Sequence, residues 1–468
     1  MADGGEFDVI VIGAGPPGEN AAGRAVDNGL TAAIVEERLA GGECSFYGCI
    51  PSKTLIRPGD VLAAARRVPG AAEAVTGEID VDAAFAQRDY MTNRWIDDGD
   101  LKWFDSKGIA FHRGHGRLAG EKAVEVSGPD GEVTRLVARR AVVVSCGTTG
   151  AIPPIEGLRD ASPWTNVEIT SAKELPRRLL VLGGGAIGVE MAQCFRRLGS
   201  EEVTVLEGAP RLLAREEPFA GTEVQEAFEA EGIQVVVGAK VAAVRREAVD
   251  APVTAVLEDG REFVGDEILV AVGRRPRTTD IGLETVGLSD LAGKYLEVDD
   301  KLRVHGADGD WLHAVGDVNG LALLTHMGKY QGRLFGDVVA GKDVRDVADH
   351  RGVPRVTFTD PQVAAVGLTE AQAREQGLDV RVVTYDIGAV SGSYVRGNGI
   401  KGTCCMVVDE SRRVVVGATF VGPDVQEIVH AATIAVVGEV PLDTLWHAVP
   451  PFPTMSEVWL RFLEAYGL

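Results

Sequence analysis

The sequence contains no uninterrupted apolar run long enough to cross a bilayer. Its first residues, Met1 to Glu6, also lack the basic and apolar regions of a secretory signal. These absences argue against a membrane-spanning helix and against a secreted precursor. We therefore expect a cytoplasmic protein.

The sequence also contains few cysteines, and its basic residues are fewer than its acidic ones. Six cysteines in 468 residues do not form a disulfide scaffold, and in a reducing compartment a close pair of cysteines is more typical of catalysis than of structure. The 47 Lys and Arg residues are outnumbered by 69 Asp and Glu residues, which gives a net charge of −22 and disfavours nucleic acid or an anionic membrane as a partner. The length suggests about three domains.

A glycine-rich turn follows a short β-branched run at residues 7–12 and leads into an alanine-rich stretch that ends near Asn28. A second apolar strand, at residues 31–35, ends at Glu36. In a dinucleotide-binding fold with this order, the glycines let backbone N–H groups approach a pyrophosphate and the acid accepts ribose hydroxyls. The glycines that we assign to cofactor binding here are Gly13, Gly15 and Gly18.

The same order recurs in the middle of the chain, where the strand at residues 179–182 precedes a second turn and the strand at 203–206 ends at Glu207. Two such units predict two dinucleotides. An acid at this position binds a free ribose 2′-hydroxyl and repels a 2′-phosphate, so Glu207 favours NAD over NADP. We interpret Arg211 and Arg215 as solvated arginines rather than as a phosphate clamp. The glycines of the second turn are Gly183, Gly185 and Gly188.

Cys44 and Cys49 lie five residues apart, shortly after the first glycine turn. In one regular helix this spacing gives about 7.5 Å of rise, beyond the usual Cα–Cα reach of a disulfide, so we place Cys44 in a loop or a distorted turn. Pro51 suits the first turn of a helix, which would place Cys49 near the positive end of a helix dipole, where a thiolate is favoured. Spacing alone leaves two interpretations, a redox-active pair and two structural cysteines.

Further motifs extend along the chain. They are Val-Ala-Val-Gly-Arg-Arg-Pro at 270–276, Ala-Val-Gly-Asp-Val at 314–318, Val-Thr-Phe-Thr-Asp-Pro at 356–361 and Val-Gly-Leu-Thr-Glu at 366–370. With the cysteine segment and the two glycine turns, the chain resembles the pyridine nucleotide–disulfide oxidoreductases, the flavoprotein family of lipoamide dehydrogenase, glutathione reductase and mercuric reductase. The resemblance covers essentially the whole chain.

The resemblance implies an α/β fold with two Rossmann-like dinucleotide-binding domains and a C-terminal α+β dimerisation domain. An FAD domain would comprise residues 1–149 and 280–349, an NAD(P) domain residues 150–279, and a dimer-interface domain residues 350–468. The enzyme would be a homodimer with FAD and NAD(P)H as cofactors. Hydride would pass from NAD(P)H to FAD, electrons would pass to the disulfide, and the dithiol would reduce a small-molecule acceptor.

The resemblance also assigns roles to single residues. Cys49 would face the flavin as the charge-transfer thiolate, and Cys44 would attack the substrate as the interchange thiol. Lys53 would lie beside flavin N5, paired with Glu190, because a buried lysine needs such a partner. Asp317 would hold the ribityl chain of the flavin. The other cofactor-binding positions that the resemblance implies are Gly147 and Gly273, and His326 matches a family position near the flavin.

The chain departs from the family at the C-terminal segment His-Pro-Thr-x-Ser-Glu, which supplies a general base to the disulfide-reducing members. The glutamate is present as Glu457, but the histidine position is Phe452. Phenylalanine takes no proton, and loss of a general base typically costs about 10²–10⁴-fold in rate. Ordinary disulfide reductase or lipoamide dehydrogenase activity is therefore in doubt.

Three interpretations of the acceptor follow. In the first, the disulfide cycles toward an unusual acceptor, with His447 as the nearest alternative base in sequence, although we expect His447 to be a structural or surface residue. In the second, electrons leave the flavin directly for a quinone or a related acceptor, against which an aromatic side chain could pack. Mercuric-ion reduction ranks last, because the chain ends without a cysteine pair.

We predict no metal site at Cys404 and Cys405, whose side chains would point to opposite faces of a strand.

Overall fold

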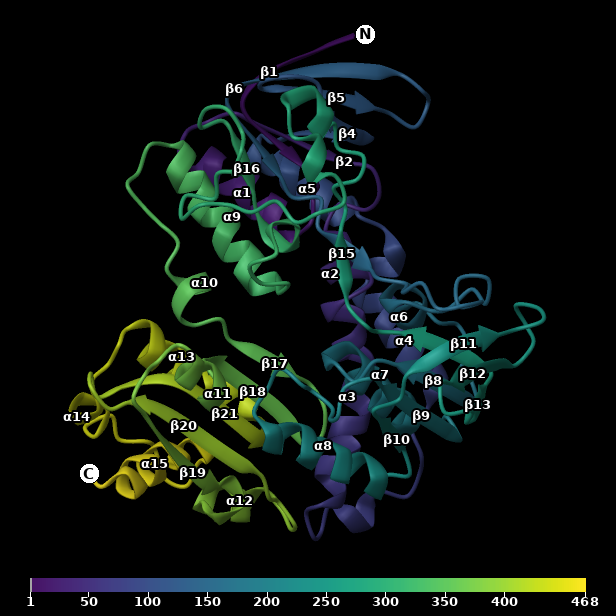
Figure 1. Cartoon of the computed structure of the whole chain (residues 1–468), viewed down its shortest axis with the longest axis vertical. Helices are drawn as coiled ribbons and strands as arrows, with labels where there is room; N and C mark the ends of the chain where they lie inside the picture. Colours follow the sequence, from purple (N-terminus) through teal and green to yellow (C-terminus); the bar gives the residue numbers. More distant parts are fainter. Residues whose placement is uncertain (1) are drawn as a thin grey trace. The chain divides into compact units, whose positions relative to one another are not determined.

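The computed structural model describes residues 2–468 and contains two compact units (Figure 1). Unit 1 comprises the described residues up to 51 together with 89–151 and 273–350, and unit 2 comprises residues 52–88, 152–272 and 351–468. Strands alternate with helices in both units, so the predicted α/β class is confirmed. The boundaries of the three domains named above stay a prediction.

Unit 1 is built on a sheet whose central strands are parallel. The strand order is β3-β2-β1-β6-β5-β4, and β16 pairs with β6 in addition. Val9, Ile10 and Val11 in the central strand are fully buried, as expected for a parallel strand covered on both faces. The strands are β1 (Ala2–Ile12), β2 (Ala32–Glu36), β3 (Ala110–Arg113), β4 (His115–Leu118), β5 (Ala123–Ser127), β6 (Val133–Val144) and β16 (Leu312–Ala314).

Two helices of unit 1, α1 (Pro16–Asp27) and α9 (Thr325–Val339), lie side by side (Figure 1). A Cβ atom on Gly332 of α9 would come within 2.3 Å of the Pro17 carbonyl oxygen, so this close approach requires glycine. The other elements that form the site in this unit are α2 (Gly42–Phe46), the start of α3 (Cys49–Arg66), β7 (Thr148–Gly150), β15 (Arg274–Pro276) and the 3₁₀ turn η5 (Gly316–Asn319).

Unit 2 contains a second parallel sheet, with strand order β10-β9-β8-β14, and a three-stranded antiparallel sheet, β11-β12-β13. The helix α7 (Ala186–Leu198) follows β8 directly, and its buried face packs in the same core as the side chains of β8 and β9. The strands are β8 (Arg178–Leu182), β9 (Glu202–Glu207), β10 (Gln234–Val237), β11 (Val241–Arg245), β12 (Val253–Leu257), β13 (Glu262–Gly265) and β14 (Glu267–Val270).

A five-stranded antiparallel sheet in unit 2 has the order β17-β18-β21-β20-β19. Helices α13 (Val425–Val437) and α15 (Val458–Tyr466) share one hydrophobic core with it. Cys404 and Cys405 are buried in β20, so the predicted strand is confirmed, and burial raises the pKa of Cys405 to about 12. The strands are β17 (Arg355–Thr357), β18 (Gln362–Gly367), β19 (Val380–Asp386), β20 (Thr403–Asp409) and β21 (Val414–Gly422).

The remaining helices are shorter or lie outside the site. They are α4 (Val81–Met91), α5 (Asp98–Lys107), α6 (Asn166–Thr170), α8 (Pro218–Ala230), α10 (Ala348–Arg351), α11 (Glu370–Glu375), α12 (Ser391–Arg396) and α14 (Leu442–Leu445). Within residues 2–468, no helix is both long enough and apolar enough to cross a membrane.

Candidate active site

The first glycine turn joins β1 to α1 and depends on the absence of side chains. Gly13 has a φ of +106°, and a Cβ atom there would lie 2.4 Å from the carbonyl oxygen of Ser145. A Cβ atom on Gly18 would lie 2.0 Å from the Gly13 carbonyl oxygen. Gly15 is the N-cap of α1, and a Cβ atom there would meet only Pro17 Cδ, at 3.8 Å. Because Pro16 and Pro17 carry no N–H, the backbone donors that this helix end can offer an anionic group are those of Gly15 and Gly18.

Glu36 lies at the carboxyl end of β2, beside this turn. Its carboxylate accepts hydrogen bonds from the backbone N–H groups of Ala14, at 2.9 Å, and Arg38, at 2.8 Å. The acid and the glycine turn are thus held together, as the order of strand, turn, helix and acid predicts. A carboxylate has about four lone-pair positions, so Glu36 can still accept from a ribose.

The second glycine turn, in unit 2, repeats this geometry. Gly183 has a φ of +111°, and a Cβ atom there would lie 2.6 Å from the Ala271 carbonyl oxygen. A Cβ atom on Gly188 would lie 1.9 Å from the Gly183 carbonyl oxygen, and Gly185 is the N-cap of α7. The chain therefore contains two glycine turns of the same geometry, one in each unit.

Glu207 takes the place in the second turn that Glu36 takes in the first. Its carboxylate accepts from the backbone N–H of Gly184 and from that of Ala209, the latter at 2.6 Å. The guanidinium of Arg211 donates to three backbone carbonyls of its own loop, those of Leu213, Ala214 and Glu216. Arg211 thus binds its own loop, in keeping with its interpretation as a loop arginine.

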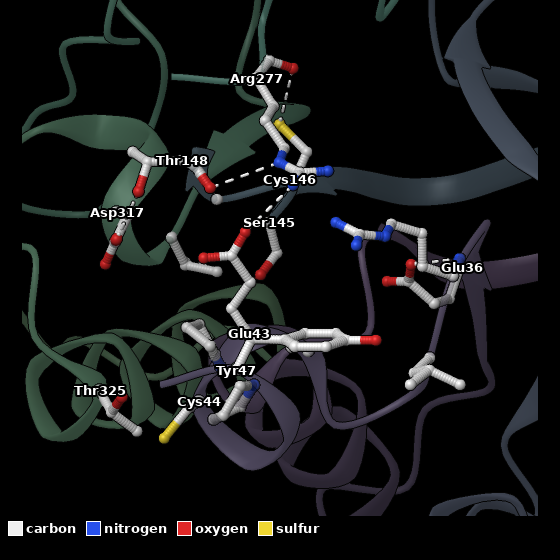
Figure 2. Close-up of a pocket in the computed structure, with 18 of the residues that line it drawn as sticks. Glu36, Glu43, Cys44, Tyr47, Ser145, Cys146, Thr148, Arg277, Asp317 and Thr325 are labelled. Atoms are coloured by element: carbon white, nitrogen blue, oxygen red, sulfur yellow. Dashed lines mark hydrogen bonds and ion pairs between the residues drawn. The ribbon is translucent and has the colours of Figure 1, made fainter. Parts of the chain in front are cut away.

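A pocket in unit 1 begins at the first glycine turn (Figure 2). Figure 2 shows Glu36 at one end and Cys44 with Thr325 at the other, and Glu43 and Tyr47 lie between them. The other labelled residues on its wall are Ser145, Cys146, Thr148, Arg277 and Asp317. The pocket thus runs from the turn to the cysteine segment.

The donor set of this pocket fits a dinucleotide. The Ser145 hydroxyl oxygen is buried on the wall and has no hydrogen-bond partner among the described residues, so a bound group can supply one. Glycine-turn N–H groups suit a pyrophosphate, and Glu36 suits a ribose. The pocket therefore offers separate partners for the phosphates and the sugar.

Asp317 in η5 lies on the same wall and accepts a hydrogen bond from the Thr148 hydroxyl at 2.7 Å. Burial raises the pKa of this carboxyl above its ordinary value. Gly147 also lines the pocket and has a φ of +66°, which favours glycine. Gly273 has a φ of +140°, and its carbonyl accepts from the Ala151 N–H at 2.9 Å.

The two candidate redox cysteines lie in different helices. Cys44 is in the five-residue helix α2, and Cys49 is the first residue of α3, with Tyr47 and Gly48 between the helices. The predicted interruption is confirmed, but Cys44 lies in a short helix rather than in a loop. Pro51 falls in the first turn of α3, as predicted, so Cys49 lies at the positive end of an 18-residue helix.

The break between α2 and α3 brings the thiols together. A Cβ atom on Gly48 would lie 2.9 Å from the Glu43 carbonyl oxygen and 3.3 Å from the Cys44 Cα, so only glycine allows this approach. The hydrogen bond from Cys44 to Cys49, together with burial, raises the pKa of the Cys44 thiol well above its ordinary range. Cys44 therefore keeps its proton at neutral pH and needs a base to act as a nucleophile.

Thr325 at the start of α9 contacts both thiols. Its hydroxyl oxygen lies 3.3 Å from Cys49 Sγ, and its hydrogen bond to Cys44 lowers the pKa of that thiol, as does the charge of Lys329 one turn later. The sequence argument singled out the neighbouring His326 instead. The structure places the exposed His326 one residue away from the wall position that Thr325 occupies.

Lys53 and Glu190, both in unit 2, form the ion pair that the resemblance implies. Lys53 Nζ lies 2.6 Å from Glu190 Oε2, and Glu190 is 5% exposed. The other carboxylate oxygen of Glu190 accepts from the Phe358 N–H at 2.9 Å, and the Phe358 ring lies 4.8 Å from Lys53 Nζ. The ring and the carboxylate together stabilise the ammonium.

The C-terminal segment places Glu457 and Phe452 in opposite environments. Glu457 is 4% exposed, and its carboxylate accepts from Arg461 at 2.5 Å and from the Ser391 N–H at 3.1 Å. Phe452 is 74% exposed, and His447 is exposed as well. The glutamate that would orient a histidine is therefore held by an arginine of α15, the helix that begins directly after it.

Several charged residues and one thiol on the pocket wall are not predicted as site residues from the sequence, among them Glu43, Arg277 and Cys146. Glu43 directly precedes Cys44, and Arg277 follows the motif at 270–276; these positions beside recognised motifs are the only signal in the sequence. Cys146 lies on the pocket wall, and its thiol donates to the Arg277 carbonyl at 3.3 Å. Burial raises the pKa of its thiol to about 12, so Cys146 is protonated at neutral pH.

Comparison with known proteins places this arrangement in a family. The sequence model of the pyridine nucleotide-disulphide oxidoreductases matches residues 7–332, and that of their dimerisation domain matches residues 353–461. A dihydrolipoyl dehydrogenase of Mycobacterium tuberculosis is 32% identical over 96% of each chain. A mercuric reductase of Staphylococcus aureus is 29% identical over 97% of this chain and 81% of its own.

Solved structures agree with these sequence matches. The flavoprotein disulfide reductase RclA from Escherichia coli, in its Cu(II) complex, is 26% identical with a TM-score of 0.84 over 97% of this chain and 99% of its own. LpdA from Mycobacterium tuberculosis is 25% identical with a TM-score of 0.86 over 98% of this chain and all of its own. The family binds FAD and a pyridine nucleotide, and its dimerisation domain supports a homodimer. The chain therefore belongs to the pyridine nucleotide-disulphide oxidoreductases and is an FAD-dependent NAD(P)H oxidoreductase of the disulfide type.

Proposed function

We propose that the enzyme oxidises NADH and passes the electrons through FAD and the Cys44–Cys49 pair to a small-molecule acceptor such as a disulfide. One observation carries this proposal. The two thiols are in hydrogen-bond contact beside a pocket whose glycine turn, acid and buried hydroxyl suit FAD. We assign the pocket to the proposed FAD domain and the second glycine turn to the proposed NAD(P) domain, in a cytoplasmic enzyme.

In this proposal, different residues of the chain have different roles. Bound FAD supplies hydride acceptance from the nicotinamide and electron transfer to the disulfide. Cys49, at the start of α3, lies where the helix dipole favours a thiolate, while Cys44 keeps its proton until it attacks the acceptor. Asp317 and Glu36 would hold the ribityl and ribose hydroxyls. The Lys53–Glu190 pair would act beside the flavin ring.

NADH is the proposed nucleotide because of the second glycine turn. Glu207 presents a carboxylate where the adenosine ribose would lie, and a carboxylate repels a 2′-phosphate. Arg211, which could otherwise bind such a phosphate, donates to three carbonyls of its own loop. The residues around the turn thus favour a free 2′-hydroxyl.

A second candidate function rests on the C-terminal segment. Phe452 takes no proton, and Glu457 is engaged by Arg461, so thiol exchange lacks its usual base. Direct electron transfer from the flavin to a quinone needs no such base, and the exposed Phe452 ring could pack against a flat acceptor in a homodimer of the family's kind.

Anaerobic titration of the FAD-loaded enzyme decides between these routes. We expect NADH to deliver four electrons per active site, two to the flavin and two to the disulfide, and NADPH to do so more weakly. Uptake of two electrons would show that the cysteines are not a redox pair. A Cys49→Ser variant, tested with disulfides and quinones, completes the experiment, because activity retained with quinones alone selects the direct route.

A further inference from the structure

Glu43 connects the cysteine helix to the pocket wall through two arginines. Its carboxylate accepts from Arg274 Nη2 at 2.5 Å and from Arg277 Nη2 at 3.1 Å. All three side chains are largely buried, with exposures of 20% for Glu43, 17% for Arg274 and 29% for Arg277. Ion pairs at this depth are screened less by salt than surface pairs.

The contacts continue from Arg274 to the residues proposed to hold the flavin. Arg274 comes from β15, which pairs with β7, and it donates to the Thr148 hydroxyl at 2.7 Å and to the Thr148 carbonyl at 3.0 Å. Thr148 in turn donates to Asp317 at 2.7 Å. A continuous series of hydrogen bonds thus joins Glu43, the residue before Cys44, through Arg274 and Thr148 to the carboxyl of Asp317.

The helix that bears Cys44 needs an external support. With five residues, α2 is far below the length of about 12–15 residues at which isolated helices become even marginally stable. Its Gly41 N-cap makes no side-chain capping bond. The Glu43 ion pairs provide side-chain contacts that fix the orientation of this short helix.

We propose that Glu43, held between Arg274 and Arg277, is a positioning residue that anchors α2 to the flavin pocket and sets the charge around the Cys44 thiol. This proposal rests on the proposed function, in which Cys44 is the interchange thiol. The carboxylate lies on the residue next to the thiol, and the two guanidinium groups offset its negative charge. The network therefore fixes the orientation of the helix that bears Cys44, and a change in its net charge is expected to change the pKa of the Cys44 thiol.

The other groups around Cys44 are known from the structure. Cys49 at the start of α3 accepts its hydrogen bond, while Thr325 and the Lys329 ammonium on α9 lower the pKa of the Cys44 thiol. Because these groups stay unchanged in variants of the network, a change of charge at Glu43 or Arg277 has a defined sign. Loss of the negative charge stabilises the thiolate, and loss of a positive charge destabilises it.

The test uses FAD-loaded enzyme, reduced anaerobically, and measures alkylation of Cys44 by iodoacetamide against pH with tandem mass spectrometry. In Glu43→Gln the amide oxygen still accepts from the arginines, and we expect the alkylation midpoint to fall by roughly one pH unit. In Arg277→Gln we expect the midpoint to rise. A purely structural role would move both variants in the same direction or leave both unchanged, and either result overturns the proposal.

Two further variants keep the test decisive. Glu43→Asp retains the charge but shortens the side chain, so we expect a midpoint near that of the parent enzyme and slower reoxidation of the pair to the disulfide. Glu284→Gln, which removes the partner of Arg117 elsewhere in unit 1, should change neither quantity. If Arg277→Gln does not fold, an unchanged midpoint in Glu43→Gln is enough to reject the proposal. Alkylation of Cys44 needs neither NADH nor an acceptor. A negative alkylation result therefore rejects the role of Glu43 without rejecting the proposed function, which the electron titration tests.

Discussion

Arg461 occupies the carboxylate that a restored general base would need. It lies 2.5 Å from Glu457 Oε1, and the Ser391 N–H binds the other oxygen. A histidine at position 452 would therefore share this carboxylate with the positively charged Arg461, which weakens its stabilisation of an imidazolium.

Restoring the base tests this view of the segment. We expect Phe452→His to raise activity with disulfides modestly, and Phe452→His with Arg461→Gln to raise it further, toward the factor of about 10²–10⁴ typical of a general base. Steady-state kcat/KM with a panel of disulfides measures both, with Arg461→Gln alone as the control. No gain in any variant would mean that a base was never the limiting element. A full gain in Phe452→His alone would show that the contact with Arg461 does not prevent Glu457 from orienting the new histidine.

Single residues could be predicted only where a motif names the residue type. The pairing of Lys53 with Glu190 is predictable because the family motif names both residues; Glu190 is 5% exposed, whereas Lys53 is 35% exposed and so less buried than expected. Thr325 was overlooked in favour of His326, because the helical phase that turns one neighbour toward the thiols is not readable from composition. Glu43 and Arg277 could not be paired from the sequence, since 234 positions separate them.

Among the secondary-structure elements, the break between α2 and α3 has the largest effect on the chemistry. Gly48 allows the two helices to meet within contact distance. In Gly48→Ala, the new methyl group would lie 2.9 Å from the Glu43 carbonyl oxygen and would push α2 away from Cys49. The two thiols would then lose the contact on which disulfide formation depends.

We therefore expect Gly48→Ala to bind FAD but to take up closer to two electrons than four from NADH under anaerobic conditions. Free thiols counted after air oxidation should rise by up to two per chain. Gly99→Ala is the matched control, because a Cβ atom at Gly99 meets no atom within 4 Å. Four-electron uptake in Gly48→Ala would contradict the role assigned to the close contact.

Elements governed by local sequence were predicted well. The first helix was expected to end near Asn28 and ends at Asp27, and the second strand of the first unit was expected to end at Glu36 and does so. The helix α2 could not be predicted, because five residues carry too little propensity and its support comes from Arg274 and Arg277, far along the chain.

For the whole molecule, exposed apolar side chains mark the region of the dimerisation domain. Val449 is 82% exposed and Phe452 is 74% exposed, within the match to that domain at residues 353–461. Trp446, at 41%, lies three residues before Val449. Exposed apolar residues clustered in sequence are typical of an interface between protein copies.

A charge at this region should separate the copies. We expect Val449→Glu to shift the sedimenting species from twice 49.5 kDa to 49.5 kDa while FAD stays bound, because the glutamate would have to be desolvated at the interface. Val249→Glu changes another exposed valine, at 68% exposure, outside that domain match and should leave the dimer intact. A monomeric Val449→Glu enzyme with full turnover would contradict the expectation that both copies of the chain contribute residues to each active site.

The α/β class and the family were predictable from the sequence, since several motifs in a fixed order identify them. The grouping of residues 52–88 with unit 2 could not be predicted in the same way, because it depends on contacts between residues that are far apart in the sequence. The same reason applies to the pocket, whose wall combines residues as far apart in the sequence as Gly15 and Thr325.

The acid beside each glycine turn also bears on how the nucleotides bind. Ala14 donates its N–H to Glu36, and Gly184 donates its N–H to Glu207, with only protein atoms involved. Each turn is thus preorganised by its own chain, and a dinucleotide that binds there loses little affinity to the ordering of a loop. The amides of Ala14 and Gly184 should accordingly be protected from hydrogen exchange even in the apoprotein.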